Sequence, residues 1–199
     1  MSQTVTFSGG SFDIPASPNQ LTATPSSFNT DTGNPSYTFQ NQNRSVIAGL
    51  GFQDNSPGGL TLNVTSQSRT TATGSTFTLG NGDDTLVIGG SVGNNFFMGN
   101  GNNNLTFQFG STNDVANFGD GSDTLVFGNR ISNTLVQLTT DSSVDTIRIA
   151  QSTTPVTGLR ITGATDIDVL FIGSTRYNYS STAGEWINPD NSADRKDFS

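Results

Sequence analysis

Two aspartates stand directly before an apolar segment in GNGDDTLVI, residues 80–88. The segment returns in altered form as GNGNNNLTF at 99–107 and as GDGSDTLVF at 119–127. Asp84 and Asp123 hold the same place in the first and third copies. Carboxylates in glycine-rich turns are hard oxygen ligands that suit calcium. The same side chains also hydrogen-bond to the backbone of turns, so either a calcium site or a metal-free ladder of Asn and Asp is open to them.

Other chemistries are excluded by composition. The chain has no His and no Cys, which removes disulfides, zinc sites with imidazole or thiolate ligands, and catalytic triads that need a histidine base. Glu185 is the single glutamate, so the 16 acidic residues are almost all Asp, and Asp prefers turns to helices. An enzyme of acid and base residues therefore has few candidates.

The net charge of −8 also limits the partners. A nucleic-acid binder needs a basic patch that neutralises phosphates, and we expect no nucleic acid. No apolar run approaches the roughly 20 residues of a membrane span, so we expect none. Residues 1–20 lack the charged and apolar regions of a secretory signal. If the protein is exported, we expect a route that does not use such a signal.

The glycine-rich segments are part of a longer repeat. They begin at residues 80, 99 and 119, and a further step of 20 reaches Thr139, just before the similar segment 143–149. A second set of short apolar segments lies between them, with the evenly spaced polar leaders Asn95, Asp114 and Asn133. Two short strands in each period of about 20 residues predict a β-solenoid.

The repeat register extends outward from these copies. Leu60, Leu79, Met98 and Phe118 follow one another at steps of 19, 19 and 20, which predicts that the coils begin before Leu60. Val46 precedes Leu86 by two periods, and Ile147 precedes Leu170 by a longer step of 23. Alternation predicts that Leu86 and Ile88, and likewise Leu125 and Phe127, point inward, while Thr85, Val87, Thr124 and Val126 point outward.

Composition and repeat together predict an all-β chain. Gly, Thr, Ser and Asn suit turns and strands better than helix interiors. We expect a β-roll-like solenoid of about 19–20 residues per coil at 45–175, preceded by an extended N-terminal arm with short strands at 1–44 and followed by a C-terminal cap at 176–199.

The glycine-rich units resemble the nonapeptide G-G-x-G-x-D-x-U-x of RTX (repeats-in-toxin) proteins. Residues 79–87, LGNGDDTLV, lack only the first glycine, and Asp84 falls on the ligand position of the family, as Asp123 does in residues 118–126. The resemblance implies calcium between coils. The residues assigned to such sites are Asp84, Asp123, Asp114, Gly80, Gly82, Gly119 and Gly121. Asn103 departs from the pattern and removes ligand charge between the two aspartates.

The C-terminal segment 176–199 contains the aromatic residues Tyr177, Tyr179 and Trp186. Tyr and Trp are favoured at protein interfaces, so these residues either cover the last coil or contact another subunit. A homo-oligomer or polymer is expected in the second case.

Two weaker patterns bear on enzymatic function. Asp166 and Asp168, at alternate positions, are predicted to share one strand face, and paired carboxylates serve glycoside hydrolysis at suitable separation. Arg148, Arg160 and Arg176 could line a groove for an anionic sugar polymer. Solvated acids on the outer face of a coil and spaced surface charges are the simpler explanations of these two patterns.

Two functional classes follow, with an enzyme third. The first is a non-enzymatic structural protein that assembles through open coil edges and its N-terminal arm into an extracellular or surface fibre, sheet or coat, with calcium as a possible ligand. The second is a virion component, such as a capsid decoration or tail protein, with a capsid rather than a cell surface as partner. The third is a solenoid that binds or cleaves polysaccharide. A calcium requirement for assembly favours the first class.

Overall fold

The fold is taken from a computed structural model, in which every element described is a β-strand. The structure describes residues 27–30, 36–41, 47–48, 51–54, 58–66, 72–151 and 155–199. Within this part of the chain no helix is long and apolar enough to cross a membrane.

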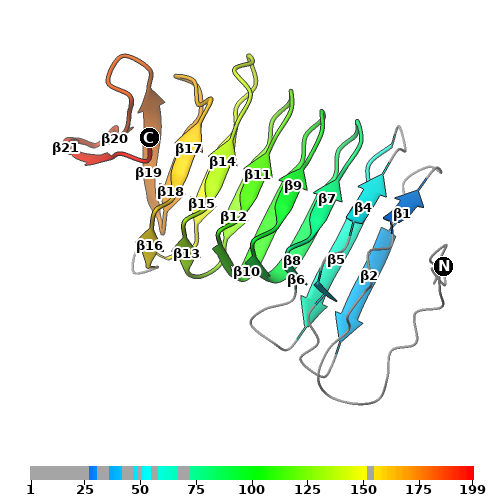
Figure 1. Ribbon diagram of the computed structural model, residues 1–199. Coiled ribbons are helices and arrows are strands. Elements are labelled where there is room, and N and C mark those ends of the chain that lie inside the picture. The colour runs from blue at the N-terminus through cyan, green and yellow to red at the C-terminus, as the bar shows by residue number, and fades with distance from the viewer. Residues whose placement is uncertain are drawn as a thin grey trace.

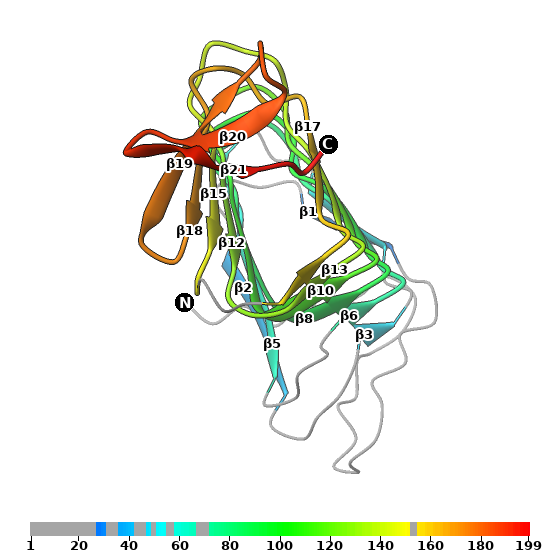
Figure 2. The same cartoon turned by 90° about the vertical axis from the view of Figure 1, so that its left-hand side faces the viewer.

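The strands form a prism with three faces (Figures 1 and 2). Face 1 contains β2 (Ser36–Asn41), β5 (Thr61–Ser66), the first parts of β8 (Thr85–Val92) and β10 (Asn104–Thr112), β12 (Thr124–Phe127), β15 (Thr146–Ile149) and β18 (Val169–Ile172). Face 2 contains β3 (Ile47–Ala48), β6 (Ala72–Thr73), the last parts of β8 and β10, β13 (Ile131–Ser132) and β16 (Val156–Thr157). Face 3 contains β1 (Ser27–Thr30), β4 (Gly51–Asp54), β7 (Thr76–Thr78), β9 (Asn95–Phe97), β11 (Val115–Asn117), β14 (Leu135–Gln137) and β17 (Arg160–Thr162).

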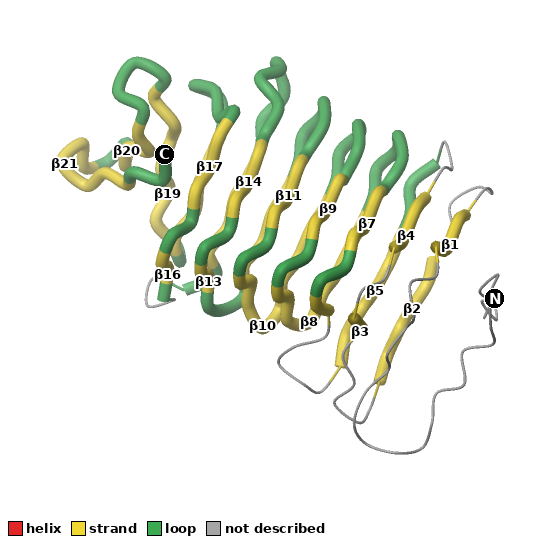
Figure 3. The backbone as a smooth tube through the Cα atoms, in the orientation of Figure 1, coloured by secondary structure: helices red, strands yellow, loops and turns green. Residues whose placement is uncertain are grey.

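Each coil runs along face 3, through a loop onto face 1, and then along face 2 before it returns to face 3. The loops between faces 3 and 1 line one edge of the prism, at the top of Figure 3. Strands of successive coils pair in parallel on every face, which confirms the predicted β-solenoid. The sequence predicted two strands per coil and did not predict the strands of face 2. Segments such as Ala72–Thr73 and Ile131–Ser132 are too short to show an alternating pattern.

The predicted register holds for the order of the strands but not for Leu60. β5, β8, β10 and β12 stack in that order. Thr61 pairs with Thr85, however, so the step between these two coils is 24 and not 19. Leu60 therefore stands level with Asp84 and not in the row of Leu79, and its carbonyl oxygen accepts the Thr85 N–H.

The predicted alignment of Asn95, Asp114 and Asn133 is wrong by one residue. Asn95 pairs with Val115, so Asp114 lies level with Asn94. For Asn95 and Asp114 the cause is an irregularity in β10, which pairs with β8 at a step of 19 up to Phe107 and at a step of 20 from Gly110. Asn133 lies level with Asn113 because the next step is 20 throughout. A bulge adds one residue without changing the pattern on either side, so spacing counted from the glycine-rich segments misses it.

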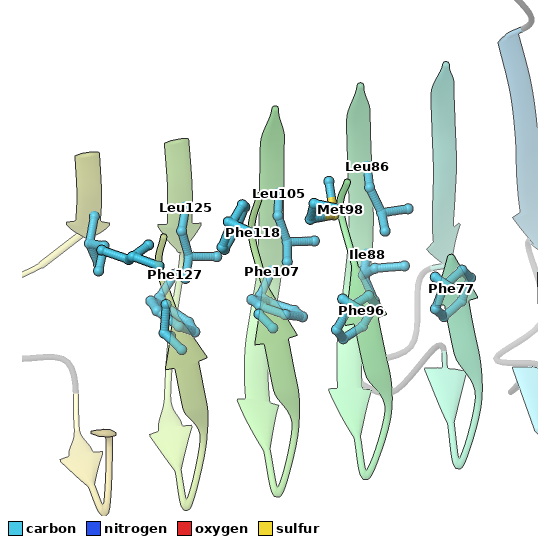
Figure 4. Close-up of a cluster of buried hydrophobic side chains, with 14 of the residues drawn as sticks. Phe77, Leu86, Ile88, Phe96, Met98, Leu105, Phe107, Phe118, Leu125 and Phe127 are labelled. Atoms are coloured by element: carbon cyan, nitrogen blue, oxygen red, sulfur yellow. The ribbon is translucent and has the colours of Figure 1, made fainter. Parts of the chain in front are cut away.

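The core is a set of parallel rows along the prism. Leu86, Leu105 and Leu125 form one row and Ile88, Phe107 and Phe127 the next (Figure 4), as the alternation predicts. The rings of Phe107 and Phe127 stack with centroids 5.4 Å apart. Burial of each such side chain contributes roughly 1.5–3 kcal/mol, so most of the stabilisation comes from contacts between neighbouring coils.

Two strands of the predicted N-terminal arm pair with the solenoid. β1 runs parallel to β4, and β2 runs parallel to β5. The rest of segment 1–44, and Val46 with its predicted two-period relation to Leu86, lie outside the described residues.

The other end of the prism is closed by antiparallel strands. β19 (Thr175–Ser180), β20 (Glu185–Asn188) and β21 (Asn191–Lys196) extend face 1 from β18 and fold over the last coil. Tyr177 and Trp186 are 4% and 2% exposed and join the core. The Ile161 N–H of β17 donates to the carbonyl oxygen of Phe198 at 2.7 Å. These contacts satisfy and cover part of the edge that the last coil would otherwise expose.

Candidate functional site: two buried polar ladders

The repeated loops between faces 3 and 1 end in an inward-pointing polar side chain. We call residues 79–84, 98–103, 118–123, 138–145 and 163–168 the corner loops. Their last residues form the corner ladder: Asp84, Asn103, Asp123, Asp145 and Asp168. All five are 1% or 2% exposed. The corner ladder is therefore an acidic column inside the prism.

Each ladder residue accepts a hydrogen bond from the backbone of the coil before it. Asp84 Oδ1 accepts the Leu60 N–H at 2.6 Å, and Asn103 Oδ1 accepts the Asp84 N–H at 3.1 Å. The later bonds, from Asn103 to Asp123, from Asp123 to Asp145 and from Asp145 to Asp168, are 2.8, 2.9 and 2.8 Å long. A buried N–H without an acceptor is costly. The ladder supplies that acceptor at the point where the chain leaves the loop and starts a strand.

Glycine lets the corner loops stack this closely. Gly121 has a φ of 130°, and a Cβ there would lie 2.3 Å from the carbonyl oxygen of Gly101 in the preceding coil. A Cβ on Gly82 would lie 2.7 Å from the backbone of Gly58. Both distances are shorter than any real contact of this kind, so the repeated glycines are explained by backbone packing.

Asn103 and Asp123 differ in how their second polar atom is used. The Asn103 amide donates to the carbonyl oxygens of Gly99 and Gly101 at 3.2 and 3.0 Å. The corresponding atom of Asp123, Oδ2, is buried and accepts no hydrogen bond from the described part of the chain. An amide is therefore fully satisfied at this position, and an ionised carboxylate is not.

The surroundings favour the protonated form of two ladder carboxyls. Burial raises the pKa of Asp123 to about 7, although the hydrogen bond from the Asn103 backbone opposes the change. Burial likewise raises the pKa of Asp145 to about 7, and the neighbouring Asp168, Asp123 and Asp141 add to the increase against the hydrogen bond from the Asp123 backbone. A neutral acid costs less to bury than a carboxylate.

A second ladder crosses the corner between faces 2 and 3. It consists of Ser75, Asn94, Asp114 and Thr134, each about 1% exposed or less. Asn94 Oδ1 accepts the Ser75 N–H at 2.7 Å, and Asp114 Oδ1 accepts the Asn94 N–H at 2.8 Å. Asp114 Oδ2 also accepts from the Ser111 hydroxyl and the Thr112 N–H, at 2.7 and 3.0 Å. Burial raises the pKa of Asp114, against these hydrogen bonds from Ser111, Asn94 and Thr112.

The residues predicted to hold calcium do not form one site. Asp84 and Asp123 lie on the same corner, two coils apart with Asn103 between them, while Asp114 belongs to the second ladder. In the described part of the chain no three acidic side chains gather as a metal-binding group. Gly80, Gly82, Gly119 and Gly121 lie in corner loops, and close packing against the backbone of another coil accounts for Gly82, Gly119 and Gly121. Asp84, Asp114 and Asp123 each accept at least one backbone N–H group, and calcium binding by these residues stays a prediction.

Sequence reasoning missed five ladder residues, Asp145 and Asp168 of the corner ladder and Ser75, Asn94 and Thr134 of the second ladder. Asp145 precedes Thr-Ile as Asp84 and Asp123 precede Thr-Leu, so the pattern in 143–149 was a sufficient signal. Asp168 is the last acid before Val-Leu-Phe-Ile, with an altered spacing in its loop. Asn94 carried no signal, because the bulge in β10 concealed its register with Asp114.

The acid pair Asp166 and Asp168 is not on one strand face. Both residues precede β18, in the turn that ends at Asp168. Asp166 is exposed and accepts the N–H and hydroxyl of Ser181 at 2.6 and 2.9 Å, whereas buried Asp168 accepts the N–H groups of Asp145 and Thr165. Both carboxylates bind the backbone, in different directions, so they do not face a common substrate position.

The cap uses its aromatic residues within the chain. The Tyr177 hydroxyl donates to Asp194 Oδ2 at 2.7 Å, and Lys196 Nζ donates to Asp194 Oδ1 at 2.5 Å. The bond from Lys196, with those from Tyr177 and Asn188, lowers the pKa of Asp194 to about 2. Tyr179 and Trp186 pack edge to face at 5.2 Å. Buried Tyr177 and Trp186 have little surface left for a second subunit, and half-buried Tyr179 has more.

No family model, curated protein or solved structure matches this chain. The parallel coils agree with a β-roll type of repeat.

Proposed function

We propose that this chain is a non-catalytic structural protein that self-assembles into an extracellular or cell-surface fibre, sheet or coat. The observation that carries the proposal is the use of the buried acids. Asp84, Asp114, Asp123 and Asp145, which would be the chemical groups of an active site, each accept backbone N–H groups between coils. The polar interior therefore serves to hold the stack together.

The outer faces support assembly because they are regular. Thr61, Thr85, Asn104, Thr124 and Thr146 follow one another across face 1 in paired register. Successive strands lie about 4.7–4.9 Å apart, so such a row presents the same kind of side chain at a fixed repeat. A second regular surface can match it over several coils at once.

We also propose that the repeat is a degenerate relative of the RTX unit, on the strength of the segments at Asp84 and Asp123 and of the parallel coils. The absence of Cys suits a protein of a bacterial surface. Calcium stays a prediction. For binding it, Asp123 offers Oδ2, which accepts no hydrogen bond from the described part of the chain, while its Oδ1 accepts the Asn103 N–H.

A virion component is the second proposal. It is favoured over a calcium-triggered matrix by the corner ladder itself, whose carboxyl groups have backbone partners without an ion. Both proposals share self-assembly and differ in whether calcium is needed for it.

One experiment tests self-assembly and distinguishes a calcium-dependent secreted matrix from a constitutive coat or virion component. The protein is purified in chelator and examined by circular dichroism, sedimentation velocity and negative-stain microscopy, before and after calcium is added. Folded, ordered assemblies in chelator support a constitutive coat or virion part, and assemblies that need calcium support a secreted matrix. A folded monomer under all conditions contradicts self-assembly.

A further inference from the structure

The outer surface of face 1 carries a row of two arginines with a phenylalanine between them. Arg148 of β15 pairs with Phe171 of β18, which pairs with Arg176 of β19, so the three side chains lie on adjacent strands. The Arg148 guanidinium lies 4.2 Å from the centroid of the Phe171 ring. Arg176 Nε donates to Asn178 Oδ1 at 3.0 Å. We call Arg148, Phe171 and Arg176 the basic row. Arg160, predicted to join it, lies on β17 of face 3.

The basic row keeps its positive charge toward solvent. Across the described ranges the ion pairs are Arg195 with Glu185 and Lys196 with Asp194, both in the cap. Arg148 and Arg176 are exposed and belong to neither pair. Stacking on an aromatic ring holds a guanidinium in place and leaves its N–H groups able to bind a carboxylate.

The corner loops carry the opposite charge. They contain eight of the 16 acidic residues of the chain and no Lys or Arg. Asp83, Asp120 and Asp166 are exposed there, in addition to the buried acids of the corner ladder. One molecule therefore offers an acidic edge and, on face 1 near its C-terminal end, a basic row.

The two surfaces have the same repeat. The basic row crosses β15, β18 and β19, and the corner loops succeed one another along the same axis (Figures 1 and 3). Arg148 and Arg176 are two strand spacings apart, about 9.5 Å. Asp120, Asp141 and Asp166 lie in three successive corner loops, so along the prism axis Asp120 and Asp166 are also about two spacings apart. Charges on two molecules with parallel axes can thus meet over several coils.

The C-terminal end is poorly suited to stacking. The cap closes it, and its outer strand β21 carries Asp194, Arg195 and Lys196, which are the kind of charged residues that discourage edge pairing. Contact along the sides of the prism is the alternative that remains at this end.

We propose that the basic row is the docking surface for a second copy of this chain, which seats the exposed acids of its corner loops against Arg148 and Arg176. The contact is lateral and aligns the two prism axes. This inference rests on the proposed self-assembly and names its partner surface. A contact between two different patches builds a ring or an open array, depending on the rotation between copies.

The test compares the variant R148Q/R176Q with R130Q, which removes an exposed arginine outside the basic row. Sedimentation velocity is measured at about 0.05 M and about 0.5 M salt, because salt screens contacts between exposed charges. We expect wild type and R130Q to assemble at low salt and dissociate at high salt. R148Q/R176Q should need at least about tenfold more protein to assemble. Circular dichroism confirms that each variant is folded.

Exchanging the charges of the two surfaces shows whether a loss of assembly is due to the proposed contact and not to a general effect of the substitutions. R148D/R176D and D120K/D166K should each fail to assemble alone and should assemble when mixed. If R148Q/R176Q assembles as wild type does, self-assembly stands and the docking surface is wrong. If the wild type stays monomeric at both salt concentrations, both proposals fail. If a monomer binds polyglutamate through Arg148 and Arg176, the partner is an acidic polymer and the docking of a second copy is overturned.

Discussion

The corner ladder and the second ladder both give acceptors to backbone N–H groups of a neighbouring coil, but they differ in what surrounds the carboxyl groups. Asp114 of the second ladder receives three donors within 3.0 Å, one of them the Ser111 hydroxyl. Asp123 of the corner ladder has Asn103 on one side and Asp145 on the other, and its Oδ2 has no donor among the described residues. Both oxygens of the Asp114 carboxylate therefore accept hydrogen bonds, one of them from the Ser111 hydroxyl. One oxygen of the Asp123 carboxyl group accepts none from the described residues.

The glycines of the two corners also differ, in how much space surrounds them. Gly121 packs against the backbone of the preceding coil. Gly93, which precedes Asn94 of the second ladder, has a φ of 66° and open space around the position of a Cβ. Asn113 and Asn133 hold the next two positions of that row with positive φ. A side chain at Gly121 is therefore opposed by backbone contact between coils, and a side chain at Gly93 by backbone conformation alone.

The largest expected effect comes from Gly121→Ala. The new Cβ meets the Gly101 carbonyl oxygen at 2.3 Å and also needs an unfavourable φ. We expect a loss of more than about 4 kcal/mol in unfolding free energy, measured by chemical denaturation. A loss below about 1 kcal/mol would show that the corner loops are less tightly stacked than this.

The next effect separates the ladders themselves. Asp114→Ala removes the acceptor of the Asn94 and Thr112 N–H groups and of the Ser111 hydroxyl, and we expect it to cost about 3–5 kcal/mol. Asp123→Ala deprives one N–H group, that of Asn103, and should cost about 1–3 kcal/mol. Denaturation of both variants at the same pH measures the difference. Equal losses would contradict the different satisfaction of the two carboxyl groups.

The pH dependence is a third consequence. An acid whose pKa is higher in the folded state binds its proton more tightly there, so it stabilises the fold below its ordinary pKa of 3.8. For Asp123 and Asp145 this contribution is lost as the pH rises toward their folded-state pKa of about 7. Asp141 and Asp194 act oppositely, because their lowered pKa values cost stability below about pH 4.

We therefore expect a higher thermal midpoint at about pH 5 than at about pH 8. Asp123→Asn should raise the midpoint at about pH 8, by about 2–4 °C per kcal/mol gained, because its amide can donate to loop carbonyl groups as that of Asn103 does. Asn103→Asp is the reverse variant and should lower it. A calorimetric profile in which Asp123→Asn leaves the pH dependence unchanged would contradict the raised pKa of Asp123.

The smallest effects belong to Gly93. Gly93→Ala should cost about 1 kcal/mol, since only the positive φ opposes it. Gly93→Asn should be nearly neutral, because Asn113 already adopts this conformation in the next coil. Denaturation curves of both variants, beside that of Gly121→Ala, test whether the corners differ as described.

The sequence predicted most of the fold because one residue pattern repeats with nearly constant spacing. Leu86, Ile88, Leu125 and Phe127 are buried as their alternation predicts. The order of β5, β8, β10 and β12 follows from the same spacing. The predicted register was wrong at Leu60 and at Asn95, because the number of residues per coil changes there. A single added residue leaves each local pattern intact and changes only which residues of adjacent coils meet.

The amino-acid sequence alone was enough to predict the solenoid, the inward rows of the core and the glycines of the corner loops, since these depend on contacts that recur in every coil. The use of the acids became clear only from the folded chain. Asp84, Asp114 and Asp123 have the residue type and spacing of ligands, but their surroundings are buried N–H groups of adjacent coils. Whether a carboxylate meets a cation or an amide depends on the register between coils, and that register is set by loop lengths and a bulge outside the repeated pattern.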